Sequence, residues 1–223
     1  MTKLELLWAE GFTDPAVPHK PLPFRLTSLS LWLERRPTPA FLRALFSACT
    51  DSLDTLHLRS DHPETSALAQ QWLLPVLHLV APRVRHLVLE QTEAAPWHLL
   101  PDGLNSFTSL ETLGLGVVGS PYSEWTLTAG LFNATVATLP RPPKLRRLAL
   151  GIKQPRNLDG VIPFLSDSRL RNLKQIDLPL ELRPDVGPLG GDAFLSACSR
   201  MGVKVALRHD LGLAKEGELF GYI

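Results

Sequence analysis

One spacing of apolar residues recurs along the chain: a leucine is followed three and then two residues later by another leucine or a close relative. The clearest copy is Leu53, Leu56 and Leu58 in SLDTLHLRS, where His57 and Arg59 alternate with the last two leucines. Six copies of this L-x-x-L-x-L frame start at residues 26, 53, 84, 110, 145 and 173, at intervals of 27, 31, 26, 35 and 28 residues. Residues two apart on a strand point to the same side, so each copy predicts a short strand with its last two leucines in the core.

Two weaker copies extend the series at both ends, each with one slot that does not hold leucine: Met1, Leu4 and Leu6, and Gly202, Val205 and Leu207. Between copies lie segments of helical periodicity. The segment PAFLRALFSAC, residues 39–49, repeats apolar residues at steps of three and four, which predicts an amphipathic helix. Its expected buried face consists of Phe41, Leu42, Leu45, Phe46 and Cys49.

The two cysteines occupy equivalent places in the pattern. Cys49 and Cys198 each end a Ser-Ala-Cys triplet, and each triplet ends four residues before a copy of the frame starts. We interpret both as small buried residues that pack a helix on the sheet, rather than as a disulfide or a metal-binding pair.

Strand and helix alternating at a period in the high twenties are typical of a β/α solenoid. We therefore predict an α/β fold with a parallel sheet on the concave face, helices on the convex face and about seven to eight irregular repeats. The chain, 1–223, is expected to form one domain, with an N-terminal repeat or cap at 1–25, core repeats at 26–201 and a last strand with a C-terminal cap or tail at 202–223.

The frame resembles that of the leucine-rich repeat family, in its ribonuclease-inhibitor-like class. Three phrases are similar to the repeat regions of fungal F-box proteins: LVAPRVRHLVLE at 79–90, FLRALFSACTDSLDTLHLRS at 41–60 and LSDSRLRNLKQIDLP at 165–179. The resemblance implies a horseshoe-shaped leucine-rich-repeat solenoid that recognises substrates for an F-box-type ubiquitin ligase.

The chain departs from the family in two respects. The ninth position of each repeat, which usually holds Asn or Cys, is occupied here by Glu34, Asp61, Thr92, Val118, Lys153 and Glu181. No F-box precedes the repeats, so a link to an SCF-type adaptor would need a missing segment or a partner.

Neighbouring parallel strands lie about 4.8 Å apart, so residues in the same slot of successive repeats form rows across the sheet. Two rows are expected to face outward: Glu5, Ser30, His57, Val88, Gly114, Ala149, Asp177 and Ala206, and Leu7, Trp32, Arg59, Glu90, Gly116, Gly151, Pro179 and Arg208. The partner-binding residues predicted on this face are Trp32, His57, Arg59, His86, Glu90, Gly114, Gly116, Arg147, Asp177 and Arg208.

Particular contacts follow from these rows. Arg59 and Glu90 are expected to lie side by side as an ion pair. The small residues Gly114, Gly116, Ala149 and Gly151 would leave a shallow floor where a partner approaches the backbone; alternatively, glycine only relieves crowding on a curved sheet. Trp8 and Trp32 are expected to face outward, either as binding anchors or as cover for the open end of the solenoid.

Composition narrows the classes of partner. The chain has 23 basic and 22 acidic side chains and a net charge of +1, so no excess field steers it to nucleic acid or a membrane, and we expect neither partner. The longest apolar run, 72–82, has about half of the ~20 residues needed to cross a bilayer. Two cysteines and no signal-peptide pattern indicate a reducing compartment, so we expect a cytoplasmic or nuclear monomer.

Signatures of catalysis were not found: the chain has no G-x-S-x-G, Walker loop, G-x-G-x-x-G, H-E-x-x-H or C-x-x-C. His57 and His86 on adjacent strands could hold a metal together with Glu90, but we interpret them as solvated histidines. The prediction is a non-catalytic protein–protein interaction module without cofactor or metal. A free-standing scaffold or regulator with no ligase link is the alternative, and a hydrolase-type enzyme is the remote one.

Overall fold

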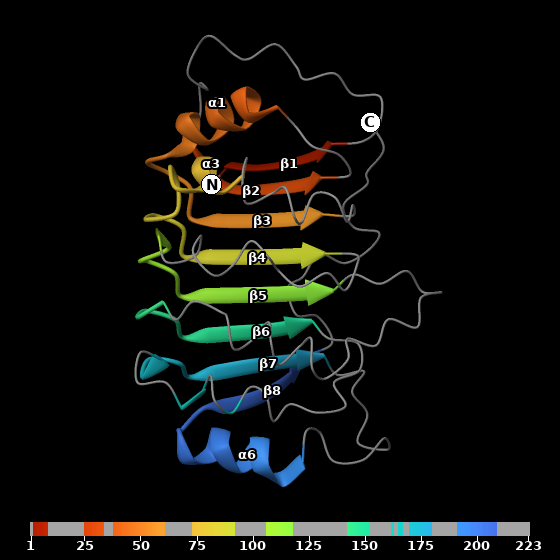
Figure 1. Ribbon diagram of the computed structural model, residues 1–223, viewed down its shortest axis with the longest axis vertical. Coiled ribbons are helices and arrows are strands. Elements are labelled where there is room, and N and C mark those ends of the chain that lie inside the picture. The colour runs from red at the N-terminus through yellow and green to blue at the C-terminus, as the bar shows by residue number, and fades with distance from the viewer. Residues whose placement is uncertain are drawn as a thin grey trace, which may run out of the picture.

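The computed structural model describes residues 2–8, 25–33, 38–60, 73–91, 106–117, 142–151, 162, 165–166, 170–179 and 191–208. Eight parallel strands form one open sheet, and their order in space is their order in the chain. The strands are β1 (Thr2–Trp8), β2 (Leu26–Leu33), β3 (Thr55–Ser60), β4 (His86–Gln91), β5 (Thr112–Val117), β6 (Arg147–Gly151), β7 (Gln175–Pro179) and β8 (Lys204–Arg208) (Figure 1).

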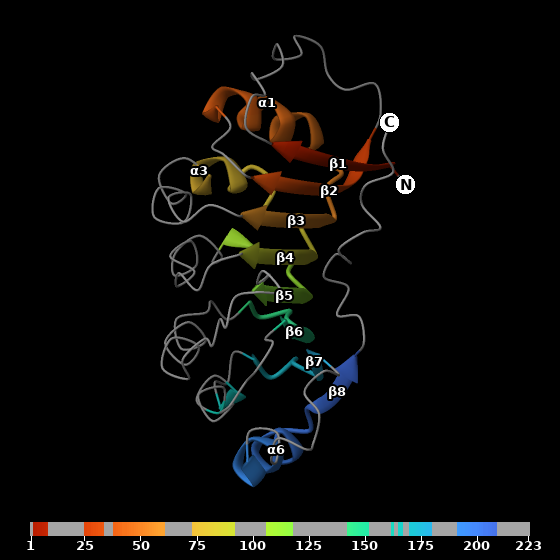
Figure 2. The same ribbon diagram turned by 90° about the vertical axis from the view of Figure 1, so that its right-hand side faces the viewer.

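Three helices accompany this sheet in the described part of the chain: α1 (Pro39–Cys49), α3 (Leu74–Leu77) and α6 (Gly191–Arg200). Figure 2 shows that the stack of strands bows, with these helices on its convex side. The fold is α/β with an all-parallel sheet in sequential order, and this arrangement is compatible with a β/α solenoid. None of the described helices has the length and apolar character to span a membrane.

The recurring leucines form the core, as predicted. Leu56, Leu87, Leu113, Leu148 and Ile176 are successive register partners across β3 to β7. In all six copies of the frame the three leucine-type positions are buried, and none is more than 6% exposed. Because these positions recur with the phase of the strands, their side chains stack into one continuous interior that reaches from β2 to β7.

Helix α1 has the predicted length and the predicted buried face. Its first turn begins at Pro39, and the side chain of Thr38 accepts a hydrogen bond from the Phe41 amide at 3.3 Å, which satisfies one of the free N–H groups at the helix start. Phe41, Leu42, Leu45, Phe46 and Cys49 are buried in the same core cluster as the strand leucines, so this face packs the helix against the sheet.

Both cysteines are buried free thiols, which confirms their interpretation as structural residues. The Cys49 thiol donates to the carbonyl of Leu45 at 3.3 Å. Burial raises the pKa of Cys49 and of Cys198 to about 11, so neither thiol is ionised near neutral pH.

The end of α6 determines which residue is buried before β8. Gly202 occupies the first slot of the weak last copy; it is exposed, unlike the first-slot residues of the six clear copies, and its neighbour Val203 is buried, at 7% exposure. The amide of Gly202 donates to the carbonyl of Ser199 at 3.0 Å, and that of Val203 donates to Cys198 at 2.8 Å. These two bonds form a Schellman motif, which needs a left-handed residue after the helix; Gly202 supplies it with φ of 66°.

Alanine at position 202 is therefore expected to lower the free energy of unfolding by about 1 kcal/mol, the cost of holding a Cβ-bearing residue in the left-handed region. No atom lies within 4 Å of the added Cβ, so steric clash does not contribute. Urea denaturation measures the change. Ser199→Ala, at an exposed position of the same helix, should change stability by less than about 0.5 kcal/mol; an equally small effect of Gly202→Ala would contradict the assignment.

Besides the hydrogen bonds within the sheet, a row of backbone bonds joins successive repeats just before their strands begin. The amides of Arg85 and His86 both donate to the carbonyl of Asp54, at 2.8 and 3.0 Å. The same two-to-one arrangement recurs at the carbonyls of Arg85, Glu111 and Arg146. These backbone bonds lie at the amino ends of the strands. The ninth positions, where leucine-rich repeats usually carry Asn or Cys, lie outside the described residues.

Candidate partner-binding surface on the concave face

The outward rows of the sheet run as the sequence predicts. The first is continuous through every strand in the order Glu5, Ser30, His57, Val88, Gly114, Ala149, Asp177 and Ala206. The second runs from Leu7 through Trp32, Arg59, Glu90 and Gly116 to Gly151, and Pro179 pairs with Arg208. His86 and Arg147 occupy a third outward row, each with Thr112 as its register partner.

Trp8 and Trp32 are not register partners, because Leu7 pairs with Trp32 and Trp8 pairs with Leu33. The side chain of Trp8 lies outside those that the structure describes, so its expected outward position stays a prediction.

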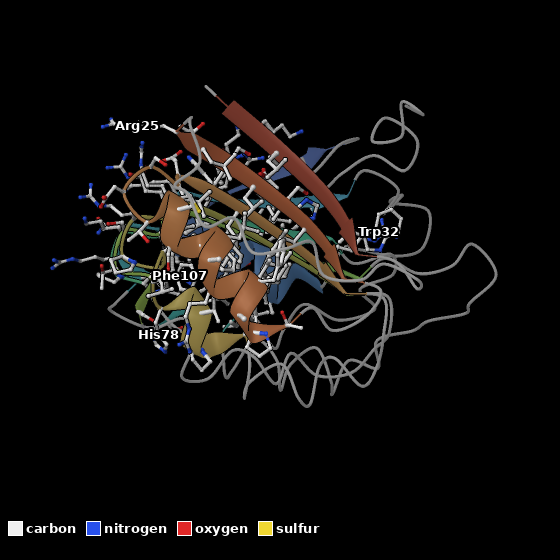
Figure 3. All side chains as sticks on the ribbon, turned by 90° about the horizontal axis from the view of Figure 1, so that it is seen from above. Arg25, Trp32, His78 and Phe107 are labelled. Atoms are coloured by element: carbon white, nitrogen blue, oxygen red, sulfur yellow. The ribbon has the colours of Figure 1, made fainter. Side chains whose placement is uncertain are left out.

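The amino-terminal half of the face contains a stacked pair. The guanidinium carbon of Arg59 lies 3.9 Å from the centroid of the Trp32 ring, and both side chains are half-buried. This is cation–π geometry between register partners on neighbouring strands. Figure 3 shows Trp32 at the carboxyl end of β2, with Phe107 on the helix side of the sheet.

Two further predicted residues adjoin this pair. The Oγ of Ser30 lies 3.0 Å from Nδ1 of His57, which fixes the orientation of the half-buried imidazole. Glu90 is the register partner of Arg59, as expected, but its side chain lies outside the described residues. The ion pair between Arg59 and Glu90 therefore stays a prediction.

The carboxyl-terminal half of the face differs from the expected open floor. Gly114 is buried, Ala149 is 3% exposed and Asp177 is 0% exposed. Asp177 was predicted to be a partner-binding residue on the exposed face, and that exposure is wrong. A carboxylate is stable in a buried place only when its charge and lone pairs are satisfied. Here Arg147 Nε donates to Asp177 Oδ2, and Gln175 Nε2 donates to Asp177 Oδ1.

Arg147 keeps a partner-facing position because its side chain is 40% exposed while it covers the buried carboxylate. For two other predicted residues, the burial of Gly116 and the side chain of Arg208 lie outside what the structure describes. Of the predicted surface, the described structure thus brings together Trp32, Arg59 and His57 in one half and Arg147 over Asp177 in the other.

A charged row that the sequence argument missed lies at the amino ends of β3 to β5. Arg85 Nε is 3.0 Å from Glu111 Oε1, and Arg85 Nη1 is 3.7 Å from Asp54 Oδ1. The hydrogen bond from Arg85, and then its charge, hold the pKa of Glu111 below its ordinary value. The signal was present in the sequence two residues before the middle leucine, where the four copies from 53 to 145 carry Asp54, Arg85, Glu111 and Arg146 with alternating charge.

His86 lies next to this charged row and not in a site with His57. Its Nε2 lies 3.8 Å from Asp54 Oδ2, whereas His57 is oriented by Ser30. Within the residues that the structure describes, no three His, Cys, Asp or Glu side chains are grouped so that they could hold a metal ion. Glu90, the third ligand of the metal alternative, has no described side chain.

The chain matches no model of a known protein family and no curated protein sequence.

Proposed function

We propose that the chain is a leucine-rich-repeat solenoid of the ribonuclease-inhibitor-like class and a non-catalytic protein–protein interaction module whose concave face contacts the partner. Following the resemblance to fungal F-box proteins, we propose substrate recognition in an F-box-type ubiquitin ligase system as its role. The observation on which the proposal rests is the Arg59–Trp32 stack on the outward face of β2 and β3.

The chemistry of this pair supports a binding role. Tryptophan and arginine are the residue types most enriched among the anchors of protein interfaces. An exposed cation–π contact contributes about 0.5–1 kcal/mol, and it holds both side chains in one arrangement before a partner arrives. Less conformational entropy is then lost on binding, which raises affinity without further contacts.

The arrangement also limits the kind of partner. The half-buried ring of Trp32 offers an apolar surface, and the guanidinium of Arg59 beside it offers planar N–H donors. A protein segment that presents an apolar side chain next to a carboxylate fits both groups. The oriented imidazole of His57 on the same strand as Arg59 adds a polar group at the border of this contact.

The test is affinity capture from the source cells with the wild-type chain, Trp32→Ala and Arg59→Glu, followed by quantitative mass spectrometry. Each variant should reduce the specifically captured partner at least about tenfold, as truncation of an interface anchor does. Arg43→Glu, the same substitution at an exposed position of α1 on the convex side, is the matched control and should capture like the wild type. Thermal melting of each variant checks that the fold is intact.

The identity of the captured proteins separates the roles. An adaptor and a cullin among the Trp32-dependent partners would support the ligase role, and Trp32-dependent partners without them would support the free-standing scaffold. Capture that is unchanged in both Trp32→Ala and Arg59→Glu would exclude this part of the concave face as the contact.

A further inference from the structure

A second charged surface lies at the amino ends of β6 to β8. We define the basic edge as six exposed cationic residues of these strands, the turns before them and the last turn of α6: Lys144, Arg146, Arg171, Lys174, Arg200 and Lys204. The amide of Lys174 donates to the carbonyl of Arg146, and that of Lys204 to the carbonyl of Lys174, each at 2.8 Å. Three of these residues are therefore on directly neighbouring segments of backbone.

A side-chain bond joins the turns that hold two more of the cations. Nδ2 of Asn172 donates to the carbonyl of Pro143 at 2.7 Å, which places the turn of Arg171 against the turn of Lys144. Arg200 ends α6, which packs against β8. The six charges thus belong to one continuous edge of the sheet.

The basic edge differs from the same edge at β3 to β5. There, Asp54, Arg85 and Glu111 alternate in sign and are paired with one another. After Glu111 the row continues with Arg146 and Lys174, which have the same sign. Lys204 on β8 is the register partner of Gln175, so it lies in the adjacent row, with its amide bonded to the carbonyl of Lys174. Like charges on neighbouring strands repel each other, so this part of the row costs stability instead of adding it. An external anion would relieve the repulsion.

We propose that the basic edge binds an acidic protein segment, an extended stretch rich in Asp and Glu. Alternate side chains of an extended peptide lie about 6.6–6.8 Å apart, and strands about 4.8 Å apart, so flexible lysine and arginine side chains can reach successive carboxylates. Among the described residues of this edge no aromatic side chain is exposed to stack a nucleic-acid base. The net charge of +1 makes the positive field local, which suits a short acidic segment better than a long polyanion.

Fluorescence anisotropy with a labelled oligoglutamate peptide tests the proposal directly, without reference to the concave face. The wild-type chain should bind the peptide at low salt and release it at high salt, because exposed charge pairs are screened. The variant Arg171→Glu, Lys174→Glu, Lys204→Glu should bind at least about tenfold more weakly. Circular dichroism checks that the variant is folded.

The matched control is Arg25→Glu, Arg43→Glu, Arg83→Glu, which makes the same change in net charge at exposed arginines outside the basic edge. Figure 3 labels Arg25, at the amino end of β2. The control should retain binding within about twofold of the wild type. Equal losses in both triple variants, no binding by the wild type, or tighter binding of a DNA duplex than of the peptide would each overturn the proposal.

Discussion

Lysine at position 177 is expected to lower the free energy of unfolding by about 3–5 kcal/mol, the cost of breaking a buried ion pair by changing one partner. Asp177 is 0% exposed, and its two carboxylate oxygens accept from Arg147 and Gln175. The substitution removes the charge that compensates Arg147 and puts a second cation next to it. Both the loss of the pair and the new repulsion act in the same direction.

Urea denaturation measures this cost, and Asp51→Lys is the matched control because Asp51 is exposed in the turn after α1. The control should change stability by less than about 0.5 kcal/mol. A double-mutant cycle with Arg147→Met and Asp177→Leu isolates the coupling between the two side chains. If Asp177→Lys cost no more than Asp51→Lys, the buried pair would not exist in solution.

This result bears on how the concave face is tested. Asp177 was predicted among the partner-binding residues of the outward face. Because it is buried, a charge reversal at this position acts on stability and cannot report on binding alone. Trp32 and Arg59 remain the informative positions for binding, because both are half-exposed and neither is a leucine-type core residue.

The strand order and register were predictable because they depend on one local property. Each copy of the frame fixes which residues of its strand face the core, and a shift by one residue would expose all of them. Leu56, Leu87 and Leu113 therefore had to become register partners, and they did. The helix at 39–49 was predictable for the same reason, since its apolar residues recur with helical spacing.

Exposure on the outward face was not predictable from the same rule. The alternation of side chains along a strand predicts on which side of the sheet a residue lies. Whether the residue is buried on that side depends on which other groups cover it. Asp177 and Ala149 occupy the expected row and are nevertheless buried. The charged row of Asp54, Arg85 and Glu111 was missed because these residues precede the strands, where the period of two does not apply.

Gly202 shows a third limit. The frame assigned it by counting from Val205, but the end of α6 sets the local backbone, and the Schellman motif moves the buried position to Val203. The leucine spacing does not take account of the left-handed residue that ends α6, so it does not predict which of the two neighbouring residues is buried.

The largest expected effect of shortening a single core side chain is at the middle of the stack. Leu113 is 0% exposed and lies between its register partners Leu87 and Leu148. Truncating a buried leucine to alanine removes transfer free energy and leaves a cavity, so Leu113→Ala should destabilise the chain by about 2–5 kcal/mol. Thr112→Ala, on the outward side of the same strand, should cost less than about 0.5 kcal/mol.

The same substitution at the edge of the sheet gives a second comparison. Leu4 on β1 is only partly buried and packs against the core from one side, because β1 has β2 as its single neighbour. Leu4→Ala should therefore cost less than half as much as Leu113→Ala, since less surface is removed from contact. Urea denaturation of the three variants measures this order. A cavity at the edge of the sheet can collapse or fill with water, whereas a cavity between two buried strands cannot. Equal costs at Leu4 and Leu113 would therefore contradict a sheet in which β5 is central and β1 is an edge strand.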